Sequence, residues 1–122
     1  MTTQETLREV PTDLPATYHQ TQTFIEDAKS LSLSLHQNGQ AQVQIESEKA
    51  KIKLHFQEEV DNDKALTNAD KRKTGLTKRL ESDEAYREFE LRLQTLKNES
   101  ALISIELRYK RDLIDLNLAF IK

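Results

Sequence analysis

The sequence contains no cysteine and no tryptophan, and only two glycines among its 122 residues. Without cysteine the chain can form no disulfide, no thiolate metal site and no thiol nucleophile, so we expect it in a reducing, cytoplasmic compartment. With only Gly39 and Gly75, it has no glycine-rich loop whose backbone amides could hold a phosphate. The histidines His19, His36 and His55 lie in different segments, so no two of them have the four-residue spacing at which a helix could present both to one metal ion. We therefore expect no nucleotide site, no metal and no cofactor.

Long apolar runs are also missing. No stretch approaches the ~18 uninterrupted apolar residues that span a membrane, and residues 1–20 lack the basic and apolar regions of a signal peptide. Catalytic carboxylates or an activated serine would need a concave pocket, which a short helical chain hardly provides. The acids Glu58, Glu59, Asp61 and Asp63 resemble a solvated helix end. We therefore predict no membrane partner, no small-molecule substrate and no enzyme activity.

The composition that remains is typical of helices with wide wet faces and a thin core. Hydrophobic residues make up 36% of the chain and charged residues 32%, and the net charge is −3. We predict a flexible arm at residues 1–15, which carry both prolines, and a single domain at residues 16–122. Within that domain the predicted elements are a short helix at 16–29, a β-hairpin at 30–46, and helices at 47–66, 69–81 and 83–120. The fold class is mainly α with a small N-terminal β-hairpin, hence α+β, around a long coiled-coil-like helical hairpin.

The hairpin prediction depends on strict alternation of apolar and polar residues. Residues 30–35 and 41–45 alternate, and Asn38-Gly39 lies between them. A three-residue loop would then place the leucines of the first arm and Ala41, Val43 and Ile45 on one face. The alternative is that Asn38-Gly39 separates two helices. Residues 49–57 are similarly open between helix and strand, because residues 51–56 also alternate.

The closing segment carries two apolar stripes. The first has the three-and-four spacing of a coiled-coil seam: Tyr86, Phe89, Leu93, Leu96, Ile103, Leu107 and Ile114. The second lies beside it: Leu102, Ile105, Tyr109, Leu113, Leu116 and Phe120. A helix with two apolar stripes needs two neighbours, and we expect the helix that begins at residue 47 and a second copy of the chain. The alternative is that the second stripe belongs to a monomer core.

One basic run stands out between residues 71 and 79, with no acid inside it: Lys71, Arg72, Lys73, Lys78 and Arg79. Seven residues separate Lys71 from Lys78 and Arg72 from Arg79, so each pair is aligned on a helix. Such a face could bind a nucleic-acid backbone or an acidic partner. The plainer interpretation is that these residues solvate the helix and pair with Glu81, Asp83 and Glu84.

From Glu48 to about Asp115 the sequence resembles a group of small helical proteins encoded by phages, prophages and cyanobacterial genomes. The similar segments are Lys49-Ala50-Lys51, the stretch from Leu66 to Lys73, Leu80 with Asp83-Glu84-Ala85-Tyr86, and Ile105-Glu106-Leu107. Some of these proteins are similar to accessory proteins of DNA recombination and replication. The resemblance implies a helical hairpin with a role near single-stranded DNA or a recombinase.

These observations lead to two functional hypotheses. In the first, the chain is a non-enzymatic, homo-oligomeric accessory protein whose basic face contacts single-stranded nucleic acid or an acidic protein of recombination or replication. In the second, it is a purely structural module for protein interaction and oligomerisation, and its apolar C-terminal helix is the functional surface.

Overall fold

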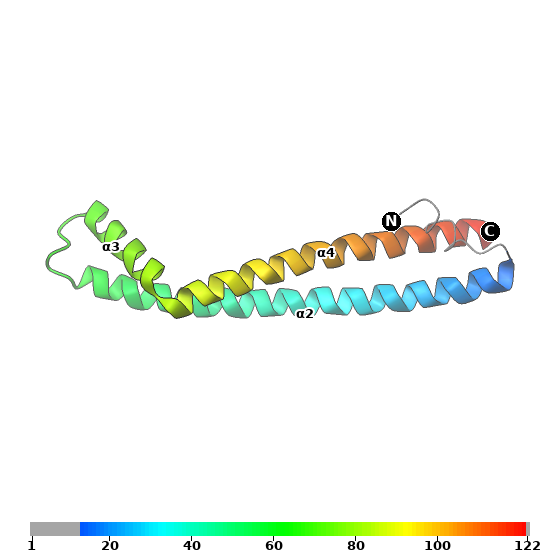
Figure 1. Cartoon of the computed structure of the whole chain (residues 1–122), viewed down its shortest axis with the longest axis horizontal. Helices are drawn as coiled ribbons and strands as arrows, with labels where there is room; N and C mark the ends of the chain where they lie inside the picture. Colours follow the sequence, from blue (N-terminus) through cyan, green and yellow to red (C-terminus); the bar gives the residue numbers. More distant parts are fainter. Residues whose placement is uncertain (1–12, 122) are drawn as a thin grey trace. The chain divides into compact units, whose positions relative to one another are not determined.

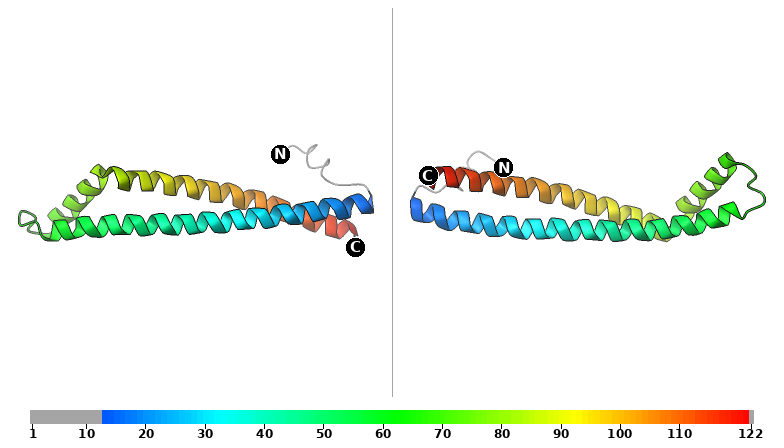
Figure 2. Two further views of the ribbon diagram at one scale, coloured as in Figure 1. Left: turned by 90° about the horizontal axis from the view of Figure 1, so that it is seen from below. Right: turned by 180° about the vertical axis from the view of Figure 1, so that it is seen from behind.

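The computed structural model describes residues 13–121, and these residues form three α-helices and no β-strand. They are α2 at Leu14–Asp61, α3 at Ala69–Ser82 and α4 at Glu84–Ile121 (Figure 1, Figure 2). The prediction of a mainly α chain is confirmed. The described residues divide into two compact units, one containing residues 13–37 and 100–121 and the other residues 38–99. The prediction of a single domain stays a prediction. No helix in the described part of the chain is long and apolar enough to cross a membrane.

Helix α2 begins directly after Asp13, which caps its first turn. The Asp13 carboxylate accepts a hydrogen bond from the Ala16 amide at 2.8 Å, and Pro15 occupies the first turn. The predicted short helix at 16–29 is therefore the first part of a longer one. Most of the predicted arm, residues 1–12, lies outside the described residues, and its last two residues, 14 and 15, are helical.

The predicted β-hairpin at residues 30–46 is wrong, because all of these residues are helical. Along α2, the side chains that are buried or half-buried recur at alternating three- and four-residue spacing and form a seam. The buried or half-buried members are Thr17, Thr21, Phe24, Ala28, Leu31, Leu35, Asn38, Gln42, Ile45, Lys49, Ile52 and Phe56. Leu33 and Val43, which the hairpin would have buried, are 57% and 69% exposed. Residues 49–57, for which the sequence left helix and strand open, lie in the same helix.

Polar residues within the seam explain why the helical period is hard to see in the sequence. Asn38 is buried and accepts a hydrogen bond from the Gln42 side chain at 2.6 Å, one helical turn away. Gly39 has no positive φ, and a Cβ built on it would meet nothing within 4 Å. Asn38-Gly39 thus makes no turn. The backbone hydrogen bonds of this segment are made within the helix.

Helix α2 ends at Asp61, earlier than the predicted residue 66. The Asp63 amide donates to the Val60 carbonyl at 3.2 Å, and the Leu66 amide donates to the Asp63 carbonyl at 3.1 Å. These turn contacts replace the helical hydrogen bonds in a segment whose acidic and amide side chains compete for backbone hydrogen bonds. The Asp83 carboxylate then accepts from the Tyr86 amide at 2.8 Å and begins α4.

In the unit made by residues 13–37 and 100–121, the two helical segments are antiparallel. The Asn117 side-chain amide donates to the Gln20 side-chain oxygen at 3.0 Å. The Lys110 ammonium lies 3.5 Å from the Asp27 carboxylate and 5.0 Å from the Phe24 ring centre. As residue numbers rise on α4 they fall on α2. The buried apolar core of this unit is Phe24, Leu107 and Leu113.

The unit made by residues 38–99 contains the rest of α2, all of α3 and the start of α4, and its buried apolar residues are Ile45, Val60 and Leu93. The Lys49 ammonium lies 5.1 Å from the centre of the Tyr86 ring. Burial raises the pKa of the Tyr86 hydroxyl, and the charges of Glu90 and Glu46 add to the effect. Tyr86 is therefore neutral and packs as part of the seam.

Candidate functional site

All five residues of the predicted basic run lie on α3, whose start is fixed by a cap. The Asn68 side chain accepts a hydrogen bond from the Lys71 amide at 2.8 Å, and its backbone is extended. The helix contains five basic and two acidic residues, and none of its residues is fully buried. α3 is thus a short, positively charged and largely exposed helix.

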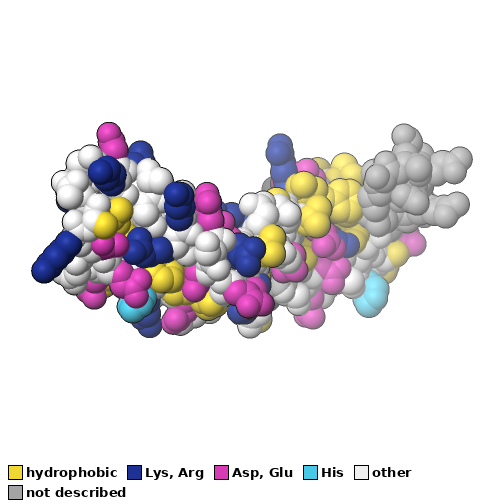
Figure 3. Space-filling view, turned by 60° about the vertical axis from the view of Figure 1, so that its left-hand side comes forward, with side chains coloured by type: hydrophobic (Ala, Val, Ile, Leu, Met, Phe, Trp, Pro, Cys, Tyr) yellow, Lys and Arg dark blue, Asp and Glu magenta, His cyan; other side chains and the backbone are white. Residues whose placement is uncertain are grey.

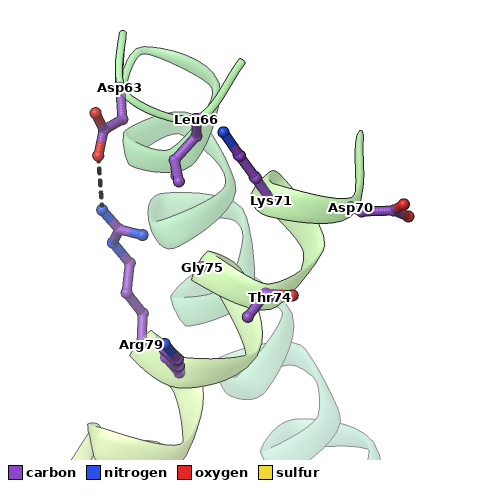
Figure 4. Close-up of a pocket in the computed structure, with 8 residues that line it drawn as sticks. Asp63, Leu66, Asp70, Lys71, Thr74, Gly75 and Arg79 are labelled. Carbon is purple, nitrogen blue, oxygen red and sulfur yellow. Dashed lines mark hydrogen bonds and ion pairs between the residues drawn. The ribbon is translucent and has the colours of Figure 1, made fainter. Parts of the chain in front are cut away.

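The two arginines of this run hold α3 in place. The Arg79 guanidinium lies 3.5 Å from the Asp63 carboxylate and 3.7 Å from that of Glu59, as Figure 4 shows for Asp63. The Arg72 guanidinium donates to the Leu66 carbonyl at 3.5 Å. Among residues 13–121 these partners come from the end of α2 and the loop after it, whereas the sequence suggested Glu81, Asp83 and Glu84. The guanidinium groups of Arg72 and Arg79 therefore contact other residues of the same chain.

The three lysines are in a different situation. Lys71, Lys73 and Lys78 are exposed, and within the described residues no ion pair involves any of them. Lys71 and Lys78 line a shallow hollow of about 530 Å³ that is shared with the 63–66 loop segment, but Lys73 does not. The basic run is thus divided by the fold into two arginines with partners in the chain and three lysines that face solvent.

Gly75 lines the hollow and leaves room for two neighbouring side chains. A Cβ on Gly75 would lie 3.0 Å from a methyl of Leu66 and 3.1 Å from the Arg79 guanidinium, so only glycine gives both side chains full room. Asp63 and Asp70 also line it, and Figure 4 shows Asp70 pointing away from Leu66. These carboxylates offset the lysine charges, so the hollow is not a concentrated anion site. Within residues 13–121 no group of acids or histidines could hold a metal ion.

The second predicted stripe of α4 divides into one core residue and an open row. Leu113 is only 3% exposed and belongs to the core of its unit, and Tyr109 is half-buried. Leu102 and Ile105 are each 67% exposed, Leu116 is 49% exposed and Phe120 is 51% exposed. We call Leu102, Ile105, Tyr109, Leu116 and Phe120 the outer apolar face. Figure 3 shows hydrophobic side chains gathered on part of the molecular surface.

Besides Leu33, which is described above, three exposed apolar residues in the same unit were not predicted as site residues: Leu14, Tyr18 and Leu118. Leu14 and Tyr18 lie in the first turns of α2, where the neighbouring seam positions are threonines. A search for large apolar side chains off the seam of each helix would have found all three.

Comparisons with protein-family models, with curated proteins and with solved structures found no match. The similarity to phage and cyanobacterial proteins thus stays a prediction.

Proposed function

We propose that this chain is a non-enzymatic, cytoplasmic protein-interaction module that binds another polypeptide through the outer apolar face of α4. The observation that carries the proposal is the exposure of Leu102, Ile105, Leu116 and Phe120 along one helix. Burial of such a side chain stabilises a complex by roughly 1.5–3 kcal/mol, and a row of them in water is typical of an interaction surface. A solvent-exposed ion pair, by comparison, contributes about 0–1 kcal/mol.

The shape of the face favours a polypeptide over a small molecule. At ~1.5 Å of rise per residue, the row from Leu102 to Phe120 is about 27 Å long, close to the length of an ordinary helix. It is a ridge on a helix and not a hollow, so it would leave a small ligand mostly in water. An amphipathic helix with apolar residues at matching spacing would cover it.

Photo-crosslinking from residue 105 tests this proposal. We expect a benzoylphenylalanine that replaces Ile105 to form an adduct with another polypeptide in cells that express the chain. The same probe at Ser104, which is exposed and points to a different side of α4, should form little adduct. Mass spectrometry of the adducts identifies the partner. Equal labelling from both positions, or none from residue 105, would remove the support for an interaction at this face.

A second function is favoured by one observation, the three exposed lysines of α3 without ion pairs. In this proposal Lys71, Lys73 and Lys78 contact the backbone of single-stranded nucleic acid, and the chain is an accessory protein of recombination or replication, as the resemblance implies. Three such contacts would position a backbone without reading its sequence. Because two of the five basic residues already have partners in the chain, we rank this function second.

Fluorescence anisotropy of a labelled single-stranded oligonucleotide at low salt tests the second function. Replacing Lys71, Lys73 and Lys78 with glutamate should weaken binding at least tenfold and reduce the slope of log affinity against log salt by about 2, at ~0.7 per phosphate contact. The control variant replaces the exposed Lys29, Lys64 and Lys97 with glutamate and has the same net charge. If the wild-type chain does not bind, or if both variants lose the same affinity, the nucleic-acid function is excluded.

A further inference from the structure

We infer that the outer apolar face takes a second copy of itself, in an antiparallel contact centred on Tyr109. This inference rests on the proposed function and names its partner. Within the outer apolar face, Leu102 and Leu116 lie seven residues on either side of Tyr109, and Ile105 lies four residues before it, as the core residue Leu113 lies four residues after it. On an α-helix these five positions fall within about 40° of the direction of Tyr109. Phe120 has no apolar counterpart in this arrangement. A stripe with this symmetry is self-complementary when the second helix runs in the opposite direction.

A two-fold axis at Tyr109 would place matching residues together. Leu102 of each copy meets Leu116 of the other, and the two Tyr109 rings meet at the axis. Ile105 meets the edge of the unit's core at Leu113, which is 3% exposed. The second copy would therefore extend an existing core. The exposed Leu102, Ile105 and Leu116 would all leave water in this one contact.

The charges beside the stripe have the same symmetry. Glu106 and Asp112 lie three residues before and after Tyr109, and Arg108 and Lys110 lie one residue before and after it. In the antiparallel pair, the exposed Arg108 lies about 3 Å along the axis from the exposed Asp112 of the other copy. Lys110 is already paired with Asp27 of its own chain. A parallel pair would set Arg108 beside Arg108 and Asp112 beside Asp112. Charge complementarity therefore favours the antiparallel pair over the parallel one.

Single cysteines can test this register cleanly because the chain contains none. We expect Tyr109→Cys to form a disulfide between two copies under mild oxidation, since residue 109 lies at the axis, where facing Cα atoms approach to about 5–6 Å. A mixture of Leu102→Cys and Leu116→Cys chains should form the mixed disulfide about tenfold more than either chain forms with itself, because equal positions lie about 21 Å apart along the axis. Non-reducing electrophoresis and mass spectrometry give the yields.

Light scattering of the unmodified full chain supplies a measurement without substitution. The mass should rise with concentration from that of one 14.1 kDa chain to that of two. The variant Leu102→Glu with Leu116→Glu should remain monomeric over the same range, because it sets carboxylates against each other in the contact. Its helical circular dichroism should match that of the wild type, since both residues are exposed.

Several results would overturn the inference. Disulfides of Leu102→Cys with itself would indicate a parallel pair. A wild-type monomer that dimerises only after removal of residues 1–12 would show that the chain's own first residues cover the face. A monomer that crosslinks from residue 105 to a different protein would exclude the second copy and leave the proposed function intact. A monomer with no crosslinked polypeptide would remove both.

Discussion

Replacing Ile45 with alanine is expected to lower the free energy of unfolding by about 3 kcal/mol, because truncation of a buried isoleucine loses transfer energy and leaves a cavity. Val43→Ala, two residues away, should change it by less than ~0.5 kcal/mol. The side chain of Ile45 is 4% exposed and that of Val43 is 69% exposed. Alanine is also the better helix former, which offsets part of any loss at residue 43. Urea denaturation followed by far-ultraviolet circular dichroism measures both values.

This pair of variants separates the helix from the predicted hairpin. On a β-strand, residues 43 and 45 lie on the same face, so both truncations would cost similar amounts. On a helix they lie about 200° apart, so only one of them lies in the seam. Losses of similar size at the two positions would contradict the helical assignment of residues 30–46, and a large difference with Ile45 the costly one would support it.

The seam of α4 could be predicted from the sequence because its members are large and apolar for most of its length. All seven predicted seam residues, from Tyr86 to Ile114, are buried or half-buried. The three- and four-residue spacing can still be recognised across the polar seam members Ser100, Lys110 and Asn117, because the seam positions before and after each of them are apolar. A helical period that is sustained over a long segment is the clearest secondary-structure signal that a sequence carries.

The segment at 30–46 could not be assigned in the same way. Its seam positions at 38 and 42 carry amides, and exposed Leu33 and Val43 supply an alternation that mimics a strand. Residues 30–46 lie in the middle of the long helix α2, and this context decides which of their apolar side chains are buried. It outweighs the local alternation and the turn signal of Asn38-Gly39. Local alternation therefore predicted the structure of this segment less well than the three- and four-residue spacing of the whole helix does.

For the basic run, the sequence predicted the helix and the alignment of its residues but not their partners. The acids that pair with Arg79 come from Glu59 and Asp63, twenty and sixteen positions earlier. Their approach depends on the turn after α2 and on the close contact between Leu66 and Gly75. Neither feature has a local sequence signature. The sequence alone therefore could not predict that the arginines of the run have partners in the chain while its lysines are exposed.

Single cysteines along α4 are expected to differ widely in their rates of thiol labelling. A cysteine on the outer apolar face, Ile105→Cys, should react with a maleimide as fast as Ser104→Cys when the protein is dilute, because residues 104 and 105 are both exposed. Leu107→Cys, in the seam, should react at least tenfold more slowly, since a buried thiol is reached only after local opening. The chain has no other thiol to interfere.

The concentration dependence of these rates tests whether α4 has one apolar face covered by α2 and another left for a second polypeptide. We predict that raising the protein concentration slows labelling at residue 105, leaves residue 104 fast and leaves residue 107 slow. If residue 105 were as slow as residue 107 in dilute protein, or residue 107 as fast as residue 104, the two-faced description of α4 would be contradicted.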